Sequence, residues 1–345
     1  MYALIRPLLF RLDAERAHGT GLRALSLSHR CGLSRLMAGP VASLPSEVMG
    51  LRFPNPVGVA AGLDKNGAHI RALFALGFGF VEIGTVTPRA QAGNPQPRMF
   101  RLPEHQAVIN RLGFNNAGLT HLVETLRNTD YSGVLGINIG RNKDTPNERA
   151  LEDYLLGLDA VYPFASYITV NISSPNTEGL RELQQRDPLT DLLGPLIKRR
   201  NQLARRSGRR VPLVVKIAPD LDQAAIEAIS DALSITGCDG LIATNTTTDR
   251  SRIQGHPLAD EAGGLSGAPV REQSNQVLAA FRQCLPKDFP LIGTGGILSG
   301  EDAAEKVRLG ASLVQFYTGL IYRGPRLVGE CVDAIAKQQA DADSR

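Results

Sequence analysis

Residues 167–177 have the sequence YITVNISSPNT, in which an apolar run passes directly into a loop of hydrogen-bonding side chains. Such a run is typical of a strand that is buried on both faces of a parallel sheet. Seven further segments rich in apolar and β-branched residues follow the same plan after residue 55. The eight segments are 57–62, 80–86, 134–140, 167–173, 211–217, 240–246, 290–296 and 312–318.

Stretches with helical spacing lie between these segments. Eight repeats of a strand followed by a helix predict an α/β protein with a (β/α)8 TIM barrel over residues 41–340. The connection 87–116 is rich in proline, glycine and arginine, and we expect it to form an extra hairpin over the barrel mouth. The helical stretches are 65–77, 148–160, 188–206, 222–236, 269–284 and 299–309.

The first 40 residues differ from the barrel in pattern and in charge. They hold six arginines against two acidic residues, a net charge of +4, and the rest of the chain is neutral with 32 basic and 32 acidic residues. Their apolar residues recur at helical spacing over 2–12 and 15–37, which predicts two short amphipathic helices. Residues 1–40 are then either an ordinary helical cap or a membrane-surface contact, and the localised positive charge favours the second. Residues 341–345 are expected to form a C-terminal tail.

The composition limits the class of protein. The chain has 345 residues, 43% of them hydrophobic, which is enough for a large core. Its four cysteines are far apart and form no CxxC pair, so we expect a reducing compartment with no disulfide framework and no zinc or iron–sulfur site. No apolar run reaches the roughly 18 residues of a membrane span, and arginines interrupt any signal-peptide pattern. A neutral barrel without a basic stripe argues against nucleic-acid binding.

Polar groups gather where the predicted strands end, which is where barrel enzymes carry their chemistry. A turn would explain polar residues at the end of any single strand, but not at the ends of eight strands that converge, so we predict a functional site there. Glycine-rich turns at 293–296 and 317–319 follow the last two strands, where such barrels bind phosphate, and Gly267 supplies a further approach. The other groups at strand ends are 62–66, Thr85, Asn138, 171–177, Lys216 and 244–246.

Lys216 interrupts an otherwise apolar strand, and an ammonium buried without a partner is costly. It could form a Schiff base as in aldolases, stay charged and stabilise negative charge on a cofactor, or belong to a plain buried ion pair. Lys65, in GLDKNG, is a candidate for binding a substrate carboxylate. A set of amide side chains suits a ring with alternating N–H and C=O groups, which favours a uracil-like heterocycle over a sugar phosphate. These amides are Asn110, Asn171, Asn176 and Asn245.

Long motifs spread over nearly the whole chain carry a family resemblance. They are ERAH (15–18), NPVGVAAGLDK (55–65), EIGTVTPRAQAGNPQPRMFRL (82–102), INRLGFNN (109–116), GINIGRNKDTP (136–146), NISSPNTEGLREL (171–183), KIAPDL (216–221), ATNTT (243–247), GGLSGAP (263–269), GTGGI (293–297) and GASLVQFYTG (310–319). In these the chain resembles the dihydroorotate dehydrogenases of the membrane-associated, quinone-dependent class.

The resemblance implies a flavoprotein that oxidises (S)-dihydroorotate to orotate in de novo pyrimidine biosynthesis. FMN is expected across the barrel mouth, with its phosphate in the last two loops. Thr318 stands where some relatives have serine, and its hydroxyl is retained. The implied FMN contacts are Ala61, Gly62, Lys65, Thr85, Asn138, Asn171, Lys216, Thr244, Gly267, Gly296, Tyr317 and Thr318. The implied substrate contacts are Lys65, Asn110, Arg111, Leu112, Gly113, Phe114, Asn171, Asn176, Asn245 and Thr246.

The resemblance also implies the roles of individual groups. Ser174 stands where this class has its general base, with Thr177 and water to pass the proton on, and Lys216 would stabilise the reduced flavin. Ser173 is left without a role. In this class the N-terminal helices lie on the membrane and form a quinone tunnel, and His18 and Arg101 match positions near the quinone head group. We therefore expect a monomeric, peripheral protein on the cytoplasmic side of the cell membrane.

Three rival interpretations fit the chain less well. The soluble class, with fumarate or NAD as acceptor, lacks the N-terminal extension and has cysteine as its base, and this chain contradicts both features. A Schiff-base aldolase using Lys216 would form a borohydride-trappable adduct, whereas a flavoprotein would be yellow. A phosphate-binding or membrane scaffold leaves the polar strand ends unexplained.

Overall fold

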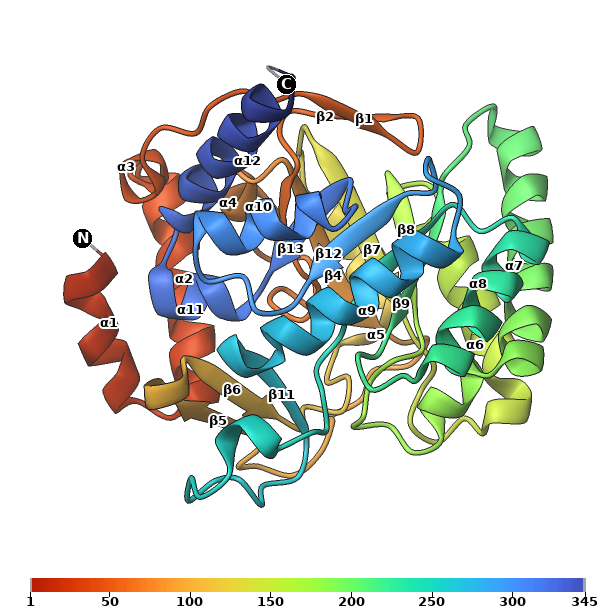
Figure 1. Ribbon diagram of the computed structural model, residues 1–345, viewed down its shortest axis with the longest axis horizontal. Helices are drawn as coiled ribbons and strands as arrows, with labels where there is room; N and C mark the ends of the chain where they lie inside the picture. The colour runs from red at the N-terminus through yellow and green to blue at the C-terminus, as the bar shows by residue number, and fades with distance from the viewer. Residues whose placement is uncertain (1, 344–345) are drawn as a thin grey trace.

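Within residues 2–343, which the computed structural model describes, eight parallel strands close into a barrel (Figure 1). Their spatial order, β3, β4, β7, β8, β9, β10, β12 and β13, follows the order of the chain, so each β-strand connects to its neighbour. All eight predicted strand segments are confirmed. The strands are β3 (Val57–Val59), β4 (Phe80–Val86), β7 (Val134–Ile139), β8 (Tyr167–Asn171), β9 (Leu213–Ile217), β10 (Gly240–Ala243), β12 (Leu291–Thr294) and β13 (Leu313–Phe316).

The barrel interior changes from apolar to polar along its axis. At the end where the strands begin, Phe80, Tyr167 and Ile242 pack in one apolar cluster with Phe53. Phe53 belongs to a hairpin of β1 (Ser46–Val48) and β2 (Leu51–Phe53), which closes this end and which the sequence pattern did not reveal. Because this end is filled by large side chains, the space for a ligand lies at the other end of the barrel.

Helices cover the outside of the barrel, and most begin and end within a few residues of the predicted bounds. The prediction over 65–77 is the exception, because only Ile70–Phe74 is helical there. The Asp64 carboxylate accepts the backbone N–H groups of Ala68 at 3.0 Å and His69 at 2.6 Å, which holds the preceding residues in a turn. The helices are α4 (Ile70–Phe74), α5 (Gly118–Arg127), α6 (Ala150–Val161), α7 (Arg186–Ser207), α8 (Gln223–Thr236), α9 (Arg271–Cys284), α10 (Gly300–Arg308), α11 (Thr318–Arg323) and α12 (Leu327–Asp343).

Helix α12 continues to Asp343, and residues 344 and 345 of the expected C-terminal tail lie outside the described residues. Short 3-10 turns fill several connections between the larger elements. They are η1 (Pro103–His105), η2 (Asn147–Arg149), η3 (Leu180–Gln184), η4 (Ser251–Ile253) and η5 (Ala268–Val270).

A small antiparallel sheet lies at the barrel mouth. The predicted hairpin in 87–116 is confirmed as β5 (Met99–Leu102) paired with β6 (Ala107–Asn110). A third strand, β11 (Gly264–Gly267), pairs with β6 and is not among the strands that the sequence predicted. This sheet brings Asn110 and Gly267 to the same side of the mouth, although 157 positions of sequence separate them.

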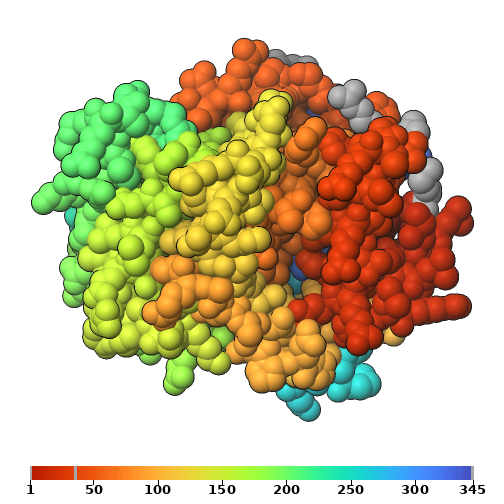
Figure 2. Space-filling view, turned by 180° about the vertical axis from the view of Figure 1, so that it is seen from behind, coloured from red at the N-terminus to blue at the C-terminus, as the bar shows by residue number. Residues whose placement is uncertain are grey.

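The N-terminal segment forms three helices rather than the predicted two: α1 (Tyr2–Arg11), α2 (Ala14–Arg30) and α3 (Ser34–Ala38). The second predicted helix is interrupted at Gly32, whose φ of +73° does not fit a helix. Figure 2 shows these helices, in red, lying against the orange residues of the following segment, with a hollow between them. Helix α2 is anchored by buried Leu22 and Leu25, whereas α1 buries no residue.

Helix α1 therefore presents apolar side chains to solvent, among them Leu4 at 80% and Leu8 at 61% exposure. Among the helices of residues 2–343, none combines the length and the apolar character that crossing a bilayer requires.

Candidate functional site

A cavity of about 1040 Å³, counted out to its mouth, opens at the carboxyl ends of the barrel strands. Almost all of the residues expected at the flavin and the dihydroorotate lie in its wall. Two expected contacts, Asn138 and Arg111, do not, and neither does Thr177, the residue expected to pass the proton on. The expected residues in the wall are Ala61, Gly62, Lys65, Thr85, Asn110, Leu112, Gly113, Phe114, Asn171, Ser174, Asn176, Lys216, Thr244, Asn245, Thr246, Gly267, Gly296, Tyr317 and Thr318.

The three residues outside the wall have other surroundings. Asn138 is fully buried behind Thr85, whose hydroxyl donates to its Oδ1 at 2.5 Å. The Arg111 guanidinium points to the rim, where it pairs with Glu261 at 2.5 Å. Thr177 is buried, and its Oγ1 has no hydrogen-bond partner within the described chain.

Ser174 lies in the cavity wall and is 6% exposed. Its Oγ accepts the backbone N–H of Asn176 at 3.2 Å, which favours the oxygen when its proton has left. The Asn176 amide donates to the backbone carbonyl of Asn110 at 3.1 Å, which ties this loop to strand β6. The loop after β8 thus presents a hydroxyl to the cavity, with a backbone N–H donor on its oxygen.

Ser173, which the sequence left without a role, links two of the amide side chains. Its hydroxyl donates to Asn171 Oδ1 at 3.0 Å and accepts from Asn245 Nδ2 at 2.9 Å. The Asn171 amide in turn donates to Thr85 Oγ1 at 2.9 Å. Because the hydroxyl is fully buried, this chain of hydrogen bonds fixes which amide atoms face the cavity.

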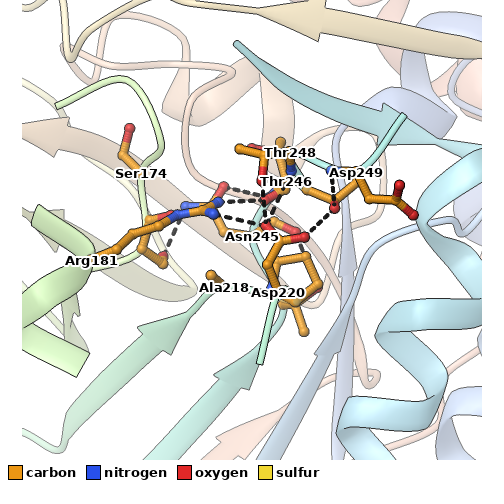
Figure 3. Close-up of polar contacts among 12 residues, drawn as sticks. Ser174, Arg181, Ala218, Asp220, Asn245, Thr246, Thr248 and Asp249 are labelled. Carbon is orange, nitrogen blue, oxygen red and sulfur yellow. Dashed lines mark hydrogen bonds and ion pairs between the residues drawn. The ribbon is translucent and has the colours of Figure 1, made fainter. Parts of the chain in front are cut away.

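Arg181 joins three of the loops that surround the cavity. Its guanidinium donates to the Ser173 carbonyl at 3.1 Å, to Asp220 Oδ2 at 2.8 Å and to the Thr246 carbonyl at 3.0 Å. Figure 3 shows the guanidinium pointing toward Asp220 and the loop of Thr246 and Thr248, with Ser174 at the side. Arg181 and Asp220 are not among the predicted site residues, although both lie within the family motifs.

Two lysines give the cavity its positive charge. Burial lowers the pKa of Lys216, and the nearby carboxylate of Glu82 partly offsets that effect. Lys65 donates to the Gly62 carbonyl at 2.9 Å. Burial also lowers its pKa, to about 8, although Glu15 opposes the shift. Both ammonium groups therefore stand where an anionic ligand would favour their charged form.

The glycine turn after β12 forms another part of the wall. Gly295 and Gly296 have φ values of +108° and +77°, and a Cβ on Gly296 would lie 2.3 Å from Arg271 Cβ. Only glycine fits this tight approach to α9. Opposite, Thr318 Oγ1 donates to Ser266 Oγ at 2.8 Å, and Ser266 lines the cavity although the sequence analysis did not single it out.

A second cavity, about 810 Å³ and mostly apolar, lies between α1, α2 and the barrel. His18 and Arg101, the two residues expected near the quinone, both line it. Arg101 donates to the Leu9 carbonyl at 3.1 Å, and its guanidinium lies 4.7 Å from the ring centre of Phe10. Tyr317, in the wall of the first cavity, has its hydroxyl 3.3 Å from His18 Nδ1, so this pair connects the two cavities.

A closed (β/α)8 barrel with a serine hydroxyl, two lysines and a glycine turn around one cavity defines a barrel enzyme. The family model "Dihydroorotate dehydrogenase" matches residues 43–338, and the chain belongs to this family.

Curated relatives place it within the family. A dihydroorotate dehydrogenase (quinone) of Stenotrophomonas maltophilia is 63% identical, over 100% of this chain and 98% of its own. Those of Flavobacterium lutescens and Chromobacterium violaceum are 61% and 60% identical, each over 98% of this chain and over 97% and 98% of their own. The chain is thus of the quinone-dependent class that oxidises dihydroorotate in pyrimidine biosynthesis, and not of the soluble class.

Solved structures agree with this assignment. The crystal structure of the dihydroorotate dehydrogenase of Eimeria tenella in complex with ferulenol is 38% identical with a TM-score of 0.87, covering 96% of this chain and 93% of its own. The ligand-free structure from the same organism has a TM-score of 0.83 at 39% identity, covering 92% and 95%.

Proposed function

We propose that the chain oxidises (S)-dihydroorotate to orotate at the first cavity, with a bound FMN, and passes the electrons to a membrane quinone at the second. The observation that carries this proposal is the convergence of Ser174, Lys216 and the Gly295–Gly296 turn on one cavity. FMN supplies the acceptor for the hydride that leaves the substrate. The residues of the chain bind, orient and move protons around it.

The cavity fits a flavin phosphate at one end. The Gly295–Gly296 turn and the hydroxyls of Ser266 and Thr318 line that end. Thr294, in the same wall, has a buried Oγ1 without a partner in the described structure, as expected of a group that awaits a ligand. Lys216 would stabilise negative charge on the flavin ring, because its buried ammonium needs an anion.

Dihydroorotate is held by groups from three sides of the cavity. Lys65 binds its carboxylate, since an ammonium in a buried wall pairs best with an anion. Asn171, Asn176 and Asn245 hold the ring through its alternating N–H and C=O groups. Asn110, at the end of β6, closes the site together with Leu112, Gly113 and Phe114, which follow it.

Ser174 acts as the general base. It removes a proton from the ring carbon next to the one that bears the carboxylate, while hydride leaves from the latter carbon. The N–H of Asn176 stabilises the serine oxygen once its own proton has passed on. Thr177 and water carry that proton away, which gives the unpartnered Oγ1 of Thr177 a use.

The second cavity takes the quinone, with His18 and Arg101 near the head group. The exposed leucines of α1 and the positive charge of residues 1–40 bind the chain to the cytoplasmic side of the cell membrane as a peripheral monomer. A chain lacking residues 1–38 should then keep flavin reduction but be reoxidised slowly by long-chain quinone. Unchanged quinone turnover in detergent would contradict this assignment.

The central test is whether dihydroorotate drives reduction of a quinone–dye couple by the purified yellow protein, compared with fumarate and NAD. Ser174→Ala should keep its flavin and lose nearly all flavin reduction. Ser207→Ala, an exposed serine at the end of α7, is the matched control and should behave as wild type. Near wild-type flavin reduction in Ser174→Ala would refute the assignment of the base.

A further inference from the structure

Lys306, on α10, is a fully buried lysine outside the cavity wall. Its Nζ donates to Ser274 Oγ at 2.8 Å and to Asn275 Oδ1 at 2.8 Å, both neutral oxygens on α9. The nearby carboxylate of Asp302 is already engaged, by Arg271 at 2.6 Å and by the backbone N–H of Leu298 at 3.0 Å. A buried ammonium held by neutral groups is costly unless it serves an anion.

The side chain of Lys306 lies directly behind the glycine turn of the first cavity. A Cβ on Gly293 would lie 3.0 Å from Lys306 Cδ, so the aliphatic stem packs on strand β12. Ser274, which accepts from Lys306, lies 3.1 Å from the Gly295 carbonyl oxygen. Two hydrogen-bond lengths therefore connect the ammonium to the peptide that lines the cavity.

We infer that Lys306 is a positioning residue for the phosphate of the cofactor. Through Ser274 it fixes the Gly295–Gly296 turn so that the backbone N–H groups face the anion, and its charge stabilises the anion from behind the turn. The inference rests on the proposed function, because it requires a ligand whose phosphate lies at this turn.

The charges around Lys306 are nearly balanced. Burial lowers its pKa to about 7, Asp302 and Glu305 on α10 oppose the shift, and Arg271 on α9 adds to it. A bound phosphate favours the protonated form, so anion binding and proton uptake by Lys306 are linked. The site thus gains a positive charge when the anion is present.

The test compares two flavins that differ only in the phosphate. FMN and riboflavin are titrated into the full-length chain, freed of flavin, and binding is followed by quenching of flavin fluorescence. In Lys306→Met, which keeps the length of the stem, the Kd of FMN should rise at least tenfold while that of riboflavin changes less than twofold. Lys287→Met, at an exposed lysine, is the control and should change neither.

Ser274→Ala removes the link to Gly295 and retains the ammonium, so it should lower the preference for FMN by a smaller factor. It also provides the same comparison if Lys306→Met does not fold. An equal rise in the Kd of both flavins, or no change in either, would overturn the inference. A wild-type chain that binds neither flavin would overturn the proposed function, and the inference with it.

Discussion

Replacing Arg181 with methionine removes a side chain that bonds to the loops after β8, β9 and β10. The change leaves the carbonyls of Ser173 and Thr246 without the donors they have in the structure, and it leaves Asp220 without its cation. A buried acceptor that loses its donor costs about 1–3 kcal/mol. The ion pair adds about 1 kcal/mol or less, because both of its side chains are still more than a fifth exposed.

These contributions predict a loss of about 2–7 kcal/mol in the free energy of unfolding, and a loss at the low end or below it if water reaches the carbonyls. The effect on catalysis should be larger than the effect on stability suggests. Ser174 follows Ser173 directly, and a misplacement of about 1 Å in a reacting group can lower a rate by roughly 100-fold. We therefore expect flavin reduction by dihydroorotate to slow by about 10- to 100-fold.

The assay is anaerobic stopped-flow reduction of the bound flavin, together with denaturant unfolding. Arg199→Met is the matched control, because Arg199 forms a similarly close pair with Asp159 on the outside of the barrel at 2.7 Å. That pair joins α6 and α7 at the surface, where solvent screens it and its contribution to stability is small. A rate within twofold of wild type in Arg181→Met, with the expected loss of stability, would show that the loops hold Ser174 without Arg181.

Three further outcomes are expected. Lys65 binds a carboxylate best when it is charged, and its pKa is about 8. The KM for dihydroorotate should therefore rise as the pH increases above about 8. Lys65→Met should show a high KM without this pH dependence. Tyr317→Phe should raise the KM for quinone several-fold, because burial raises the pKa of Tyr317 and lowers that of His18 to about 4, so that the phenol donates to a neutral imidazole. The ring stays in the wall of the first cavity, so flavin reduction should change by a smaller factor. Leu8→Glu should weaken co-sedimentation with anionic vesicles, whereas Leu156→Glu, which changes a leucine of similar exposure on α6, should not.

The barrel was predictable because its strands are buried on both faces and lie in sequence as apolar runs. The order of strands along the chain is also their order in the barrel, so no long-range pairing had to be guessed. The hairpin β1–β2 was not predicted, because its strands have three residues each, which is too few to show an alternating pattern of apolar and polar residues. The helix over 65–77 failed for a local reason, since the Asp64 side chain takes the N–H groups that a helix would use.

The same topology explains how far the candidate site could be predicted. A residue at the end of a barrel strand lies at the barrel mouth, independently of the conformation of the loops. Lys216 and Asn171 could therefore be placed from the strand pattern alone. The groups that hold them in position could not, because their partners depend on how separate loops meet. Arg181 reaches Thr246 across 65 positions of sequence, and Asn245 reaches Ser173 across 72.

Those distant partners explain why NISSPNT holds more polar groups than the reaction uses. Ser173 and Ser174 are adjacent, yet the Ser174 hydroxyl lines the cavity, whereas the Ser173 hydroxyl forms hydrogen bonds with the amides of Asn171 and Asn245. Ser173→Ala would remove the hydroxyl bonds to Asn171 Oδ1 and Asn245 Nδ2 and so loosen both amides. Asn171 would still donate to Thr85, and Asn245 Oδ1 would still accept the backbone N–H of Thr246. The substitution should therefore weaken dihydroorotate binding without removing the base. A rise in KM with little change in the rate of flavin reduction at saturation would separate this supporting role from the chemistry of Ser174, whereas a loss like that of Ser174→Ala would contradict the division.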